Sequence, residues 1–282
     1  MQKKWYLKGR ALLNEIGQAY PGEEELLFWY LGQCGFAFKK EKTVYIDPVL
    51  NDITDEKGNS RRHYPAPFEP KEVRADYVLC THGHDDHLAL ETVMGIAGAD
   101  LGTKFIVPGE GAEILKKAGM EEERIIEASA GKTIALPGLT VFPIAAAHPE
   151  YRKTARGGDT ALCYEMTMGN IRLLHMGDTY LKAQLLEDLQ KLESPDLFIS
   201  PINGTDYFRT AGGCIGNLSA IETARLAVML KADMTIPDHY DMMQGNTVDP
   251  LDFVRSLREL DSAAKWHLPA LGECVIYRKK RQ

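Results

Sequence analysis

The chain has 282 residues, of which 44% are hydrophobic and 26% charged, a composition typical of a soluble globular protein. Its formal net charge is -7, opposite in sign to that of proteins that bind nucleic acid over their whole surface. No stretch approaches the roughly 20 apolar residues that span a bilayer. Five widely spaced cysteines, no C-x-x-C pair and no secretory signal lead us to expect a cytoplasmic protein without disulfides.

The predicted elements begin with an amphipathic helix near the amino terminus, with Leu7, Ala11, Leu12 and Ile16 on one face. Ten runs rich in β-forming residues follow, each ending in polar, Gly or Pro residues. These predicted strands cover residues 25–32, 42–48, 75–82, 104–109, 139–147, 161–167, 171–178, 196–202, 233–239 and 273–278.

Helical patterns separate several of these strands. They cover residues 88–97, 111–118, 181–192, 218–230 and 251–260. Ser219 and Glu222 have the spacing of a capping box at the start of the fourth of them. Strands mixed with helices indicate an α/β layered fold, and without a clear linker or repeat we expect one domain over residues 1–282. Three long polar connections, at 49–74, 149–159 and 203–216, are candidate functional loops.

The strongest chemical signal is the segment THGHDDH, residues 81–87, directly after the apolar run YVLC. In extended backbone, residues two apart point to the same side, so His82 and His84 present their imidazoles toward one point. Asp86 and His87 lie in the turn that follows and face a second point nearby. Imidazole and carboxylate groups are ligands for metals such as zinc and manganese. We therefore interpret this segment as metal-binding rather than as a solvated polar turn.

Three more candidate ligands, His148, Asp178 and His239, stand at or just beyond the ends of apolar strands. In open α/β sheets, ligands bind at the carboxyl ends of strands, so these residues can converge on one edge. Alone, each would fit a surface histidine or an Asx turn. Beside residues 81–87, we expect all three to bind metal.

The remaining histidines are assigned other roles. His175 is expected to support the ligands from behind or to be structural. His63 lies in a basic loop and is a candidate substrate contact, whereas His267 is far from every motif and is expected to be structural.

The order H-x-H-x-D-H, then His, then Gly-Asp, then His resembles the motif order of the metallo-β-lactamase superfamily over residues 47–239. This resemblance implies a four-layer αββα sandwich with metals at one edge of its two sheets. It implies one site formed by His82, His84 and His148, a second formed by Asp86, His87 and His239, and Asp178 bridging them. Asp47, in YIDP, resembles the aspartate that orients the histidine loop without binding metal.

The implied cofactors are two divalent ions, manganese or zinc. Two ions about 3.5–4 Å apart lower the pKa of a shared water toward neutrality, so that it can attack a carbonyl or phosphorus. Asp86 is the candidate catalytic residue that orients this nucleophile or passes a proton to the leaving group.

Several segments also resemble the L-ascorbate-6-phosphate lactonase branch, namely 31–39, 46–52, 61–73, 175–180 and 235–246. That resemblance implies hydrolysis of a lactone of a phosphorylated sugar acid, and assembly into homo-oligomers. A small anionic substrate needs cationic or polar partners. The substrate-binding candidates are Arg61, Arg62, His63, Arg152, Lys153, Arg156, Arg209 and Tyr240.

Two alternatives remain open. The same arrangement of ligands supports phosphodiester or RNA hydrolysis, although the acidic charge and the lack of room for an inserted domain weigh against nucleic acid. A noncatalytic relative that only binds a ligand is disfavoured, because every expected ligand position is filled.

Overall fold

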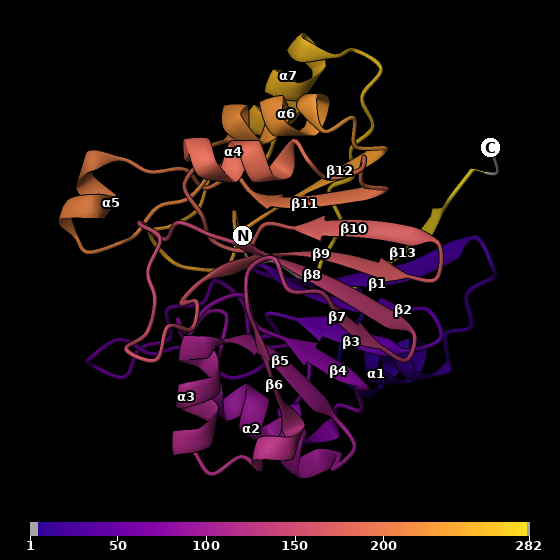
Figure 1. Ribbon diagram of the computed structural model, residues 1–282, viewed down its shortest axis with the longest axis vertical. Coiled ribbons are helices and arrows are strands. Elements are labelled where there is room, and N and C mark those ends of the chain that lie inside the picture. The colour runs from indigo at the N-terminus through magenta and orange to yellow at the C-terminus, as the bar shows by residue number, and fades with distance from the viewer. Residues whose placement is uncertain (1–4, 281–282) are drawn as a thin grey trace.

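Two mixed β-sheets form the centre of the computed structural model, which describes residues 5–280 (Figure 1). The first sheet has the order β13-β1-β2-β3-β4-β5-β6. Its strands are β1 (Glu25–Gly32), β2 (Gly35–Lys39), β3 (Thr43–Ile46), β4 (Tyr77–Leu79), β5 (Lys104–Pro108), β6 (Ile125–Ala128) and β13 (Cys274–Arg278). The second has the order β12-β11-β10-β9-β8-β7. Its strands are β7 (Ile134–Leu136), β8 (Leu139–Ala145), β9 (Leu162–Met168), β10 (Ile171–His175), β11 (Leu197–Pro201) and β12 (Met234–Asp238).

Helices cover the outer faces of both sheets and complete the predicted four-layer αββα sandwich (Figure 1). The first sheet packs against α1 (Gly9–Gln18), α2 (Leu90–Ala99) and α3 (Gly109–Lys117). The second is covered by α4 (Ala183–Leu189), α6 (Ala220–Met229) and α7 (Leu251–Leu260), while the short α5 (Tyr207–Ala211) projects from the body. Short 3-10 helices occur at Pro70–Glu72 and Glu122–Arg124. In the described part of the chain, no helix is long and apolar enough to cross a membrane.

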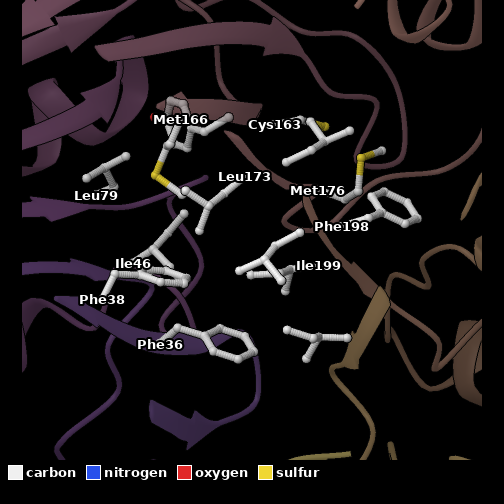
Figure 2. Close-up of a cluster of buried hydrophobic side chains, with 14 of the residues drawn as sticks. Phe36, Phe38, Ile46, Leu79, Cys163, Met166, Leu173, Met176, Phe198 and Ile199 are labelled. Atoms are coloured by element: carbon white, nitrogen blue, oxygen red, sulfur yellow. The ribbon is translucent and has the colours of Figure 1, made fainter. Parts of the chain in front are cut away.

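The space between the sheets is filled by apolar side chains from both (Figure 2). Phe36 and Ile46 from the first sheet face Leu173 and Ile199 from the second, and all four side chains are fully buried. A second buried cluster joins the outer face of the first sheet to its helices. Packing on both faces explains why the strands read as nearly continuous apolar runs.

Strand directions bring the predicted ligands to one edge of the sandwich. In the first sheet, β3 and β4 run parallel. In the second, β8 and β10 are both antiparallel to β9, and β12 is parallel to β10 through β11, so all three share a direction. The segments that follow these strands therefore emerge together, and an isolated bridge between His82 and Ala161 ties the two sheets there.

The structure also corrects several sequence-based expectations. The helix after the histidine cluster begins at Leu90, two residues later than predicted, and Ala11 of α1 is exposed although it was assigned to the apolar face. Three strands and one helix were missed. They are β2, separated from β1 by only two residues, β6 and β7, which are short and lie at sheet edges, and the five-residue α5. Short edge strands carry too few apolar residues to show a period.

The capping box predicted for α6 is present. The Ser219 side chain accepts from Glu222 N, while Glu222 Oε2 accepts from Ser219 N at 2.8 Å. We expect Ser219→Ala to lower the free energy of unfolding by about 1 kcal/mol, because it leaves a helix-end N–H without its acceptor. Urea denaturation of this variant and of Ser256→Ala, in the interior of α7, measures the effect. A loss no larger than in the Ser256 variant contradicts the prediction.

Candidate metal centre

The histidine loop is fixed from below by Asp47, which follows β3 and is fully buried. Its Oδ1 accepts from the Thr81 backbone N–H at 2.7 Å, and its Oδ2 accepts from the Thr81 hydroxyl at 2.7 Å. Oδ2 also lies 2.7 Å from Nδ1 of His87, which leaves Nε2 of that ring to face the site. The carboxylate thus sets both the loop backbone and the orientation of one imidazole, the supporting position expected of it.

A first group of ligand atoms consists of His82, His84 and His148. His82 Nε2 lies 2.9 Å from His84 Nδ1, and His148 Nε2 lies 3.3 Å from the same atom. Burial lowers the pKa of His82 well below its usual value and that of His148 to about 4. Both imidazoles are therefore neutral at physiological pH, the form in which histidine binds metal.

A second group, facing the first, contains His87, Asp178, His239 and also Cys34. The two oxygens of Asp178 lie 3.2 Å from His87 Nε2 and 3.3 Å from His239 Nε2. Burial disfavours protonation of both imidazoles, but the carboxylate of Asp178 raises the pKa of each above its usual value. Burial opposes the ionisation of Asp178, but the two histidines hold its pKa well below the usual range.

Asp178 lies between the two groups. The oxygen that faces His239 is also 3.7 Å from His148 Nε2, so one carboxylate reaches both sets of ligands. Asp86 sits at the edge of the second group, with Oδ2 3.8 Å from His239 Nε2 and 4.0 Å from His87 Nε2. All seven predicted ligands are thus brought together.

The donor set suits a pair of divalent cations. His87 Nε2, which lies 3.2 Å from Asp178 Oδ1, is buried and has no hydrogen-bond partner of suitable geometry among the described residues. Ring nitrogens of His82 and His148 both lie close to Nδ1 of His84. The imidazoles of His87 and His239 both face the carboxylate of Asp178. Imidazole nitrogens and carboxylate oxygens that converge in this way form a donor set that suits zinc, manganese or iron.

Sequence reasoning missed two residues in this centre, Gln33 and Cys34, which form the turn between β1 and β2. Gln33 Nε2 donates to Asp86 Oδ2 at 2.7 Å, and Cys34 Sγ lies 3.8 Å from Asp178 Oδ1. Burial raises the pKa of the Cys34 thiol well above its usual value. The glycines on either side of the pair, Gly32 and Gly35, were the only available sign of a sharp turn.

His175 lies behind the second group rather than in it. Its ring is fully buried, with Nε2 3.0 Å from the carbonyl oxygen of Cys34 and 3.6 Å from Asp238 Oδ2. Burial raises the pKa of Asp238 well above its usual range. These contacts place His175 beside the second group, and its supporting or structural role stays a prediction.

Several substrate-binding candidates are engaged elsewhere. The Arg62 guanidinium is buried and donates to the carbonyls of Val49, Asn51 and Tyr64. Arg209 binds Asp206, Asn246 and the Asn203 carbonyl. Tyr240 is buried and stacks on Tyr30, with ring centroids 6.1 Å apart. These three side chains are therefore held by protein groups, and their role as substrate contacts stays a prediction.

The other candidates are exposed or lie elsewhere. Arg61, His63 and Arg156 are exposed. Arg152 and Lys153 line a groove of ≈ 770 Å³ on the outer face of the second sheet, beside Phe142 and α4, and Lys153 is paired with Asp159. None of the candidate metal ligands lines that groove. His267, expected to be structural, lies 3.5 Å from Glu273.

After chelation, the contribution of His148 to stability should fall as pH falls from about 6.5 to about 4. Over this range an unfolded His148 binds a proton, whereas the folded chain keeps this imidazole neutral. At this residue the unfolded state then binds more protons, so its contribution to the free energy of unfolding rises with pH. Urea denaturation after chelation should show a weaker pH dependence for His148→Ala than for the wild type. Equal dependence in both proteins contradicts the prediction.

The sequence of this chain is similar to those of known proteins. A family model described as a beta-lactamase superfamily domain matches residues 42–240. A "UPF0173 metal-dependent hydrolase" of Archaeoglobus fulgidus is 29% identical over 235 residues, which cover 81% of this chain and 89% of that protein. A protein of the same description from Thermoplasma acidophilum is 28% identical over 228 residues, covering 80% and 88% of the two chains.

Solved structures share the fold. Igni18, described as a novel metallo hydrolase from Ignicoccus hospitalis, superposes with a TM-score of 0.68 at 22% identity, over 91% of this chain and all of that one. An isothiocyanate hydrolase from Delia radicum gut bacteria superposes with a TM-score of 0.66 at 18% identity, over 90% of this chain and 100% of that one.

Proposed function

The chain belongs to the metallo-β-lactamase superfamily and is a metal-dependent hydrolase of it, and we propose that it opens a lactone or a related carboxylic ester of a small anionic molecule. The observation that carries the hydrolytic part is the position of Asp178, within 3.7 Å of imidazoles from both ligand groups. A carboxylate so placed suits two adjacent divalent ions.

The side chains divide the work. His82, His84 and His148 would hold one ion, and Asp86, His87 and His239 the other, with Asp178 shared. Bound in this way, the ions would supply a Lewis acid for the attacked carbonyl and would lower the pKa of a water molecule toward neutrality. Asp86 Oδ2 accepts from Gln33, so Oδ1 would take up a proton and deliver it to the leaving oxygen.

The choice of a carboxylic ester rests on the resemblance of five segments to lactonases and on the acidic net charge of -7, which disfavours nucleic acid. Three candidate cations, Arg62, Lys153 and Arg209, bind protein groups. Because these cations are already paired, the proposal does not require a phosphate group on the substrate. Arg61 and His63, on the connection between β3 and β4, and Arg156 are exposed and remain the candidates for an anionic group.

The test uses the whole protein, stripped of metal with a chelator and reloaded with manganese or zinc. Ring opening of a panel of lactones would be followed by proton release, alongside bis(p-nitrophenyl) phosphate. We expect lactone turnover that needs metal and disappears in His84→Ala, with His267→Ala as a control that keeps it. Absence of turnover with every ester removes the proposal, and faster cleavage of the phosphodiester replaces it with phosphodiesterase activity.

A further inference from the structure

Gln33 occupies a backbone conformation that its side chain does not favour. Among residues 5–280, the non-glycine residues with positive φ are Gln33 (57°), Asp47 (42°), Lys231 (53°) and His239 (54°). Three of these four lie at the metal centre. Left-handed backbone in residues other than glycine costs free energy and tends to persist where function depends on it.

The backbone of Gln33 is held against a ligand from the other sheet. Its carbonyl accepts from the His239 N–H at 2.9 Å and from the Tyr30 hydroxyl at 3.3 Å. The turn between β1 and β2 thus fixes the position at which His239 leaves β12. The side chain is fully buried as well.

The side-chain amide reaches two ligands of the second group. Nε2 donates to Asp86 Oδ2 at 2.7 Å and lies 3.0 Å from His239 Nε2. The same oxygen of Asp86 is 3.8–4.0 Å from the imidazoles of its group, and among the described residues Gln33 is the side chain that donates to it. Gln33 Oε1 is buried without a hydrogen-bond partner in the same part of the chain. An unpaired buried oxygen disfavours folding, so the amide is kept here at a cost to stability on its oxygen side.

Building on the proposed function, we propose that Gln33 is a positioning residue for the second ion. Its amide N–H holds Asp86 at the edge of the group, with the carboxylate oxygen turned toward His239. Without this donor, Asp86 would swing toward solvent, since its side chain is already 17% exposed. Partners that orient metal ligands typically contribute 10–100-fold to metal affinity.

Two variants separate positioning from a purely structural role. Gln33→Met keeps the length of the side chain and removes the donor. Gln33→Gly also removes the donor but relieves the left-handed backbone, because glycine adopts positive φ freely. Competition with a chromogenic chelator would give the number of bound ions and the affinity for each. We expect about 10–100-fold weaker binding of one ion in both variants, with the metal-free Gly variant unfolding at or above the wild-type temperature. Gln18→Met, at the exposed end of α1, is the matched control.

A double variant tests whether Gln33 acts through Asp86. Gln33→Met combined with Asp86→Ala should bind metal no more weakly than Asp86→Ala alone, because the donor then has nothing to hold. Additive losses, or full affinity in Gln33→Gly, would overturn the inference. If the wild type binds a single ion, the two-ion part of the proposed function fails, and the comparison of the variants at that ion still decides the role of Gln33.

Discussion

Replacing Asp178 with asparagine should remove hydrolytic activity and reduce bound metal by the largest factor of any single change. The carboxylate lies 3.2, 3.3 and 3.7 Å from nitrogens of His87, His239 and His148. Its negative charge would therefore attract the cation of both ligand groups. Asparagine keeps the shape but loses the charge. Since partners that only orient ligands are worth 10–100-fold, we expect a loss of more than about 100-fold in affinity.

Elemental analysis after dialysis, together with turnover of the best substrate, measures both effects. His267→Ala is the control for a substitution outside the centre, since this imidazole faces Glu273. The Asp178 variant should still fold, because it replaces one buried polar group with another of equal size. If it retains the metal content and the rate of the wild type, the assignment of the two groups as a metal centre is wrong.

Asp47→Ala should be the most destabilising single substitution at the site. It removes the acceptor for the Thr81 N–H, the Thr81 hydroxyl and His87 Nδ1, all at 2.7 Å and all buried. Removing one partner of a buried charged pair typically costs about 3–5 kcal/mol. His87 would also lose its fixed orientation, which should lower metal affinity about 10–100-fold.

Urea denaturation of the chelated protein isolates the effect on folding, and chelator competition the effect on metal. Asp188→Ala, which removes a surface pair with Lys191, provides the comparison and should change stability by less than about 1 kcal/mol. A loss for Asp47→Ala as small as this would mean that the Thr81 loop is held by other contacts.

Much of the metal centre could be predicted because its residues follow strands. The segment 81–87, Asp178 and His239 each stand at or near the end of an apolar run, and strand direction then brings them to one edge. Gln33 and Cys34 could not be predicted in the same way. They lie in a two-residue turn whose distance to Asp86 and Asp178 depends on how the sheets stack, and the sequence carries no local sign of that.

The loop cations show a related limit. Arg61 and Arg62 are neighbours in the same polar segment, yet one is exposed and the other is buried against three carbonyls. Only the path of the folded loop separates them. The missed strands β6 and β7 were short and lay at sheet edges, where the apolar pattern is weakest.

The ligands come from both halves of the sandwich, with His82, His84 and His87 after β4 and with His148, Asp178 and His239 after strands of the second sheet. Ions bound between them would therefore link the two sheets at this edge, and their binding free energy would add to the free energy needed to separate the sheets. Chelation should then speed amide hydrogen exchange first at the strand ends along this rim. The opposite rim, which contributes no ligand, should keep its protection.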